Sequence, residues 1–135
     1  MWRATVPIAI VMTVLCLFLA NAVTYARRPT TYSVGGDDGW DPVVPMDTWG
    51  LFWARGKTFY AGDIPEFKYD DQRFNLIVVN RTGYETCEAN VGAIEYSSGD
   101  DKIQLHYGYN YFIGTYTPED CSTGLKMAIK ALAPK

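Results

Sequence analysis

Few residues in this 135-residue chain could carry metal or redox chemistry. It contains one histidine, His106, and three cysteines, which are Cys16, Cys87 and Cys121. Cys121 stands in YFIGTYTPEDCSTGLK, residues 111–126, a loop between strand-like stretches that could hold a metal ion, anchor a disulfide or bind a partner. A blue-copper centre requires two imidazoles and one thiolate. A single histidine cannot supply that set within one chain, so we expect no metal and no other cofactor.

The N-terminal segment, residues 1–26, has the features of a secretory signal peptide. Arg3 precedes a short apolar run, and small residues follow that run in the spacing typical of cleavage sites. The run is short for an uncleaved membrane anchor. We expect cleavage after Ala26, with Ala22 as the alternative cleavage site, and a mature domain of residues 27–135.

The cysteine count then predicts one disulfide. Cys16 would leave with the signal peptide, and Cys87 and Cys121 would remain in an oxidising compartment, where pairing is the default. Two free buried thiols are the alternative. The bridge would close a loop of roughly 35 residues, worth on the order of 3–4 kcal/mol in the chain-entropy model.

Acidic doublets are the remaining candidates for catalysis or for calcium binding. They occur at four expected turns, where aspartate is common for backbone reasons: Asp37/Asp38, Asp70/Asp71, Asp100/Asp101 and Glu119/Asp120. No spacing identifies a calcium loop or a glycosidase carboxylate pair. A single histidine without a free thiol also gives a catalytic triad little support. We therefore expect a protein that is not an enzyme.

Composition and patterning indicate one small all-β domain. Hydrophobic residues make up 48% of the chain and charged residues 20%, enough for a compact core. Alternating or apolar runs predict strands at residues 66–70, 74–80, 102–116 and 124–132, and the second should be buried on both faces. Six or more short strands between turns predict a β-sandwich or β-barrel.

Two features suggest the outer surface. Asn80–Thr82, NRT, is an N-glycosylation sequon placed where a buried strand ends, although a sequon can remain unused. The aromatic run HYGYNYF, residues 106–112, could stack on sugars or on a partner. We favour core packing of every second ring of that run, with His106 facing outward.

Seven segments follow, in order and spacing, the pattern of the plant phytocyanins: YSVGGDDGW, WARGKTFYAGD, FKYD, NLIVVN, YETC, YSSGDDKIQL and YFIG…DCSTGLK. The chain resembles that family over about residues 31–132, and within it the early nodulin-like branch. The resemblance implies a cupredoxin-type Greek-key β-sandwich or barrel with one disulfide, and Cys87 and Cys121 match the disulfide pair of the family. Copper-binding phytocyanins also use two histidines, a cysteine thiolate and an axial methionine or glutamine.

Carried across residue by residue, the resemblance implies that all four copper ligands are absent. The positions hold an aromatic, a glycine, an acid and an aliphatic residue: Phe74, Gly114, Asp120 and Leu125. The loop up to Cys121 is one residue longer than usual, so Thr115 can replace Gly114 in the alignment, and neither binds copper. We expect Phe74 and Leu125 to fill the vacated space. We expect Asp120 to face solvent or to accept backbone N–H groups of its turn.

Two departures from the family pattern also carry expectations. Pro65 has no N–H for a sheet ladder, so its strand should begin late or lie at an edge. The chain closes on ALAPK, without the proline-rich stretch and hydrophobic tail of many early nodulin-like proteins, so we expect a secreted, soluble form unless the sequence is truncated.

These features predict a secreted, early nodulin-like phytocyanin that does not bind copper. It would act in the apoplast, in the cell wall or at the outer face of the plasma membrane, as a recognition protein or wall-associated glycoprotein. Expected partners are a cell-wall glycan or a receptor ectodomain, bound by a loop on the rigid sandwich: Thr115, Tyr116, Glu119 and Asp120. Blue-copper electron transfer and a purely structural wall role are the alternatives.

A net charge of −3, which becomes −4 with the loss of Arg3, gives no reason to expect nucleic acid or an acidic membrane surface as a partner. We also expect no direct membrane span in the mature chain.

Overall fold

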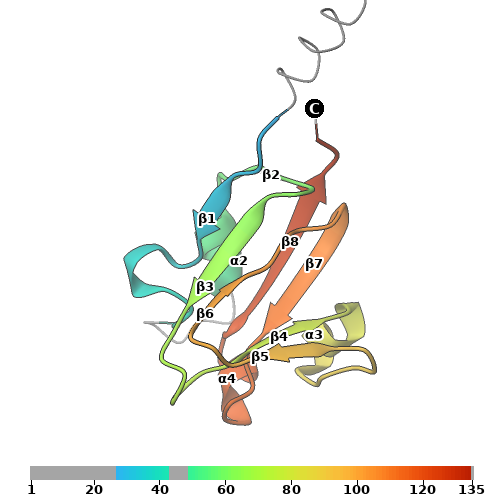
Figure 1. Ribbon diagram of the computed structural model, residues 1–135. Helices are drawn as coiled ribbons and strands as arrows, with labels where there is room; N and C mark the ends of the chain where they lie inside the picture. The colour runs from blue at the N-terminus through green and yellow to red at the C-terminus, as the bar shows by residue number, and fades with distance from the viewer. Residues whose placement is uncertain (1–26, 43–48, 135) are drawn as a thin grey trace, which may run out of the picture.

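The computed structural model describes residues 27–42 and 49–134, which form a two-layer β-sandwich (Figure 1). The signal peptide expected at residues 1–26 lies outside the described residues. In chain order, the elements are β1 (Thr31–Ser33), the 3₁₀ turn η1 (Gly36–Asp38), α2 (Trp49–Ala54), β2 (Phe59–Tyr60), β3 (Ile64–Lys68), β4 (Leu76–Val79), α3 (Arg81–Thr86), β5 (Ile94–Tyr96), β6 (Asp100–Lys102), β7 (Gly108–Ile113), α4 (Glu119–Ser122) and β8 (Lys126–Leu132).

The strands form two sheets whose neighbours are mostly distant in sequence. One sheet has the order β1-β3-β6 and the other the order β2-β8-β7-β4-β5. The pairs β1–β3 and β2–β8 are parallel, and the other pairs are antiparallel. Both ends of the described chain lie at one end of the sandwich, and α4 lies at the other (Figure 1). The predicted all-β sandwich is confirmed.

The main core lies between the sheets and follows the period of two. On β8, Met127, Ile129 and Ala131 are buried, and Lys130 between them is exposed, as predicted for residues 124–132. The other buried members come from both sheets and from the loops between them: Val34, Trp40, Phe59, Phe67, Phe74, Leu76, Leu105, Phe112 and Leu125.

Strand β4 is buried on both faces, as its apolar sequence predicted. Leu76 belongs to the main core, whereas Ile77 and Val79 face the other way, into a small second cluster with Ile113 and Cys121. The short helix α3 covers this second cluster through Tyr84. Helices α2, α3 and α4 were not predicted, because a helix of four to six residues is too short to show an apolar periodicity.

The predicted continuous strand at residues 102–116 is wrong, because β6 and β7 lie in different sheets. The chain turns between them at Gly108, whose φ is 94°. The buried Asn110 side chain holds this turn: its Oδ1 accepts a hydrogen bond from the His106 backbone N–H at 3.2 Å, and its Nδ2 donates to the His106 carbonyl at 2.9 Å. A buried amide thus replaces the strand hydrogen bonds that the turn interrupts.

This turn reverses which positions face the core. Leu105 is buried, but beyond the turn Phe112 is buried instead of the odd-numbered tyrosines. Tyr107 and Tyr109 are 71% and 55% exposed, and Tyr111 is half-buried. The expectation that every second ring packs in the main core is therefore wrong for Tyr107 and Tyr109. The outward orientation expected for His106 is confirmed.

The expectation for Pro65 is also wrong. Its strand, β3, begins at Ile64 and is the central strand of its sheet. Pro65 still accepts a hydrogen bond at its carbonyl from the Ile103 N–H at 3.1 Å. The pairing of β3 with β6 starts one residue after Pro65, with Glu66 opposite Lys102. The missing N–H of Pro65 therefore lies just outside this pairing and removes none of its hydrogen bonds.

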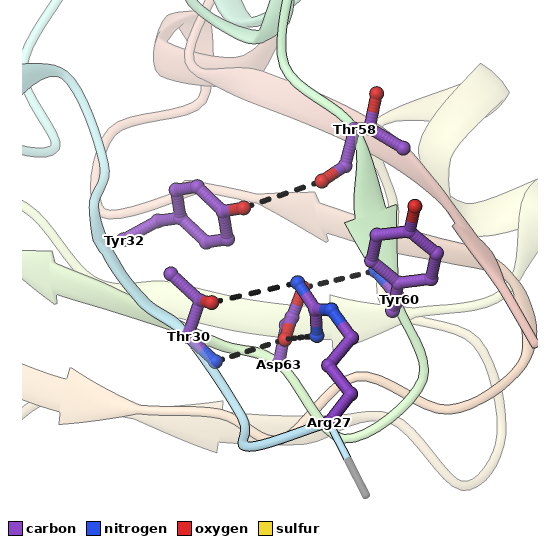
Figure 2. Close-up of polar contacts among 6 residues, drawn as sticks. All are labelled: Arg27, Thr30, Tyr32, Thr58, Tyr60 and Asp63. Atoms are coloured by element: carbon purple, nitrogen blue, oxygen red, sulfur yellow. Dashed lines mark hydrogen bonds and ion pairs between the residues drawn. The ribbon is translucent and has the colours of Figure 1, made fainter. Parts of the chain in front are cut away.

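One buried carboxylate fixes the first described residues to the sandwich (Figure 2). Asp63 is fully buried and accepts hydrogen bonds from Arg27 Nη1 at 2.6 Å and from the backbone N–H groups of Thr30 at 2.9 Å and Tyr60 at 3.0 Å. The Arg27 guanidinium also lies 4.0 Å from the centre of the Tyr60 ring. Burial alone would raise the pKa of Asp63, but the hydrogen bonds from Arg27 and from the two backbone groups hold it below its ordinary value.

Candidate functional site

The four positions assigned to vacated copper ligands come together near α4. The Gly114 N–H donates to the Leu125 carbonyl at 2.9 Å, and the Leu125 N–H donates to the Asp120 carbonyl at 2.8 Å. Phe74 and Leu125 are buried in the same core cluster, with Phe74 5% exposed and Leu125 fully enclosed. Phe74 directly precedes Asn75, whose carbonyl oxygen lies 3.2 Å from the position of a Cβ on Gly114, so the four residues lie in one region of the sandwich.

Leu125 occupies the space beside Gly114. A Cβ atom built on Gly114 would lie 2.3 Å from Leu125 Cδ2 and 2.8 Å from Leu125 Cγ. It would also lie 3.2 Å from the carbonyl oxygen of Asn75. These distances are shorter than van der Waals contact, so a thiolate side chain at this position requires Leu125 to move.

The residues present do not fit a copper ion. Of the four residues, Asp120 is the one whose side chain has atoms that could coordinate a metal ion. Both of its carboxylate oxygens already accept hydrogen bonds. Its Oδ2 accepts the Thr117 backbone N–H at 3.0 Å and its Oδ1 accepts the Thr117 hydroxyl at 2.7 Å, as expected for its turn. Across residues 27–42 and 49–134, no group of three or more His, Cys, Asp or Glu residues is placed to hold a metal ion. A blue-copper site therefore has no support among these side chains.

The predicted disulfide is confirmed. Cys87 and Cys121 are bonded, with their Cα atoms 5.7 Å apart and a sequence separation of 34. Cys87 is the C-cap residue that follows α3, and Cys121 lies within α4, where it is fully buried. The bond therefore ties the loop before β8 to the helix that covers the second cluster.

The candidate binding loop, residues 115–120, is held at both ends. The Thr115 N–H donates to Asn75 Oδ1 at 2.7 Å, and Asn75 Nδ2 donates to Glu95 Oε1 at 2.9 Å. Cys121 holds the other end. Between them the Tyr116 side chain is 52% exposed and Glu119 is exposed.

Sequence reasoning missed the role of Asn75. It lies 5% exposed beside the aliphatic β4, and its backbone carbonyl also accepts the Trp40 indole N–H at 2.9 Å. The available signal was one amide residue at the start of an otherwise apolar run, because buried amides need partners.

Asn80 lies at the start of α3 and is exposed. Its Oδ1 accepts the Gly83 N–H at 2.8 Å, so the side chain caps the helix. Exposure of Asn80 and Thr82 makes the sequon accessible, and its use remains a prediction.

No helix in the described ranges has the length and apolar character needed to cross a membrane.

Comparisons of the sequence and of the structure with known proteins point to the same family. Residues 43–125 match a family described as the plastocyanin-like domain. The chain is 92% identical to early nodulin-like protein 22 of Arabidopsis thaliana over 131 residues, covering 97% of this chain and 91% of that protein.

Among solved structures, cucumber basic protein, a blue copper protein, matches with a TM-score of 0.67 and 41% identity, over 76% of this chain and 100% of that chain. Cucumber stellacyanin with Cu²⁺ matches with a TM-score of 0.68 and 25% identity, over 80% of this chain and 100% of that chain.

Proposed function

Because this chain belongs to the plastocyanin-like domain family, as an early nodulin-like phytocyanin with a cupredoxin-type fold, we propose that it acts outside the cell as a recognition protein without copper. The observation that carries the proposal is the Leu125 side chain, which fills the space beside Gly114. The donor atoms of a blue-copper centre are replaced by apolar packing, so the sandwich serves as a rigid scaffold for its loops. It binds a partner rather than catalysing a reaction.

The extracellular location rests on two features of the chain. Residues 1–26 are a signal peptide, and the mature domain is residues 27–135. The Cys87–Cys121 disulfide suits an oxidising compartment. Asn80 carries an N-glycan in this location.

The binding surface of this proposed function is the loop of Thr115, Tyr116, Glu119 and Asp120. Its ends are fixed by Asn75 and by the disulfide, which lowers the ordering cost of binding. The exposed Tyr116 ring supplies contact area at its centre. The partner is a cell-wall glycan or a receptor ectodomain.

Metal analysis tests the absence of copper. Secreted protein refolded with excess copper should stay colourless and bind less than one copper ion per chain. An intense visible thiolate-to-copper band would instead favour blue-copper electron transfer; cucumber basic protein is described as a blue copper protein.

Binding by the loop is tested by replacing Tyr116 and Glu119 with alanine and capturing partners from wall extracts and from receptor ectodomain libraries. Tyr107→Ala is the matched control, because Tyr107 is an exposed tyrosine outside the loop. Capture should be lost in the loop variants at an unchanged melting temperature and kept in the control. Capture that survives both loop substitutions contradicts this assignment.

A further inference from the structure

A row of three tyrosine rings lies on the outer face of the five-stranded sheet. Tyr109 and Tyr111 come from alternate positions of β7, and Tyr84 comes from α3. The ring centres of Tyr109 and Tyr111 are 6.0 Å apart with planes 14° apart, and those of Tyr111 and Tyr84 are 5.3 Å apart. We call these three residues the tyrosine row.

Three separate hollows lie along the tyrosine row. Tyr109 lines all three: one of about 360 Å³ toward Asn80 and His106, one of about 290 Å³ toward Arg81, and one of about 340 Å³ toward Lys57. With its side chain more than half exposed, Tyr109 forms the ridge between them. Each of the three hollows is open to solvent, which suits an extended chain that crosses Tyr109 better than a compact small molecule.

Cations flank the row at both ends. Lys126 Nζ lies 4.1 Å from the centre of the Tyr84 ring, and Lys130 Nζ lies 5.8 Å from that of Tyr109. Lys57 adds a third ammonium group in the hollow next to Lys130. In the part of the chain that the structure describes, none of these three lysines has a carboxylate partner.

Among the residues that line these hollows, Glu85 is the one acidic residue. Glu85 lines one hollow, and its carboxylate is paired with Arg81 at 2.9 Å. The groove is thus positively charged on a chain whose net charge is −3. A local excess of one sign on a protein of the opposite sign points to a ligand of complementary charge.

We propose that the tyrosine row and its flanking lysines bind an acidic polysaccharide, a polymer of uronic acid units. Sugar C–H groups carry partial positive charge and stack on the negative faces of aromatic rings. Uronate carboxylates pair with Lys126, Lys130 and Lys57. The open groove accommodates successive sugar units. The inference rests on the extracellular location in the proposed function, but it uses a different surface from the loop at residues 115–120.

The test measures binding of de-esterified oligogalacturonate to the secreted protein by calorimetry, beside its methyl-esterified form and a neutral β-glucan oligomer. De-esterified ligand should bind at least tenfold more tightly than either, and its affinity should fall with added salt. A single-stranded oligonucleotide of matched charge should bind more weakly. Equal affinity for the esterified, neutral or nucleic-acid probe overturns the proposal, as does an absence of binding.

Two variants locate the site. Tyr109→Ala and Lys130→Gln should each weaken oligogalacturonate binding about tenfold at an unchanged melting temperature, because both side chains are exposed. Lys102→Gln is the matched charge control, since Lys102 is an exposed lysine of the other sheet. An equal loss in Lys102→Gln indicates general charge attraction and overturns the proposal.

Two further arms separate the alternatives. Binding that appears only after removal of the glycan from Asn80 means that the protein's own glycan covers the groove, and it also overturns the proposal. The loop is tested by partner capture with Tyr116→Ala and Glu119→Ala, and the groove by oligogalacturonate affinity with Tyr109→Ala and Lys130→Gln, so the two experiments share neither variants nor readout. Failure of the loop and failure of the groove are therefore distinguishable.

Discussion

The Cδ2 atom of Leu125 lies 2.3 Å from the point where a Cβ on Gly114 would stand. The two residues are also joined by the hydrogen bond from the Gly114 N–H to the Leu125 carbonyl at 2.9 Å. A glycine and a bulky aliphatic side chain are thus matched in volume across two neighbouring segments. Gly114 and Leu125 therefore accommodate each other, and a larger side chain at position 114 would have to displace Leu125.

This coupling predicts a non-additive pair of substitutions. Gly114→Cys should cost about 1–3 kcal/mol of unfolding free energy, because the new side chain overpacks against Leu125. Leu125→Ala should cost about 2–5 kcal/mol, because it leaves a cavity. The double variant should cost less than the sum, by about 0.5–3 kcal/mol, since the cysteine enters the space vacated by leucine. Urea unfolding of the four proteins measures the interaction, and additive costs would contradict the packing.

A second prediction concerns Asn75, whose amide joins the loop at Thr115 to Glu95. Asn75→Ala leaves the partly buried Thr115 N–H without its acceptor, so it should cost about 1–2 kcal/mol. Amide exchange at Thr115 should accelerate, because the loop loses its first anchor. Glu95→Gln is the control, since its side-chain oxygen still accepts from Asn75 Nδ2 and exchange at Thr115 should stay slow. Unchanged exchange at Thr115 in Asn75→Ala would contradict this role.

The sequence predicted the sheets well where one signal dominated. The alternation of apolar residues in β8 predicted a strand correctly, because one face of that strand is buried. The apolar run of β4 also predicted a strand correctly, because both of its faces are buried. Strand β7 was assigned the wrong inward face. Its orientation depends on the Asn110 side chain, which holds the turn at Gly108 and reverses the alternation. Such a local side-chain-to-backbone contact leaves no periodic trace in the sequence.

The site was predictable in its residue types and not in its packing. The positions of Phe74 and Leu125 followed from neighbouring motifs, and pairing of Cys87 with Cys121 followed from the count of cysteines. The contact of Leu125 with Gly114, and the anchoring of the loop by Asn75, depend on how distant strands meet. The tyrosine row was missed for the same reason, because its exposure follows from the reversed face of β7.

A pH prediction follows from Asp63. Its folded-state pKa is lowered, so its unfolded-state pKa of about 3.9 is the higher of the two. The stabilisation is therefore present above the unfolded-state pKa and is lost as pH falls through the folded-state pKa. Asp63→Asn should cost on the order of 1–3 kcal/mol at neutral pH, because it replaces a buried carboxylate that accepts hydrogen bonds from Arg27 and from two backbone N–H groups.

Urea unfolding between neutral pH and pH 2 checks this. The wild type should lose stability below about pH 4, and Asp63→Asn should lose less over the same interval. Asp37→Asn, at an exposed aspartate, should change stability at neutral pH by less than about 0.5 kcal/mol. If the wild type and Asp63→Asn lose the same unfolding free energy between neutral pH and pH 2, the Asp63 carboxylate is not the cause of the acid-dependent loss of stability.

The last prediction separates two roles of Asn80, which caps α3 and begins the sequon. Thr82→Ala and Asn80→Asp both remove the sequon, and both leave a side-chain oxygen that can accept the Gly83 N–H. The secreted protein should lose the mass of one glycan in each case. Asn80→Ala removes the glycan and the cap together, so it should cost about 1 kcal/mol more than Thr82→Ala. Mass spectrometry of the secreted forms and urea unfolding of all three variants measure the two effects. An unmodified wild type would show that the sequon is unused, and equal stability of Asn80→Ala and Thr82→Ala would show that the cap contributes nothing measurable.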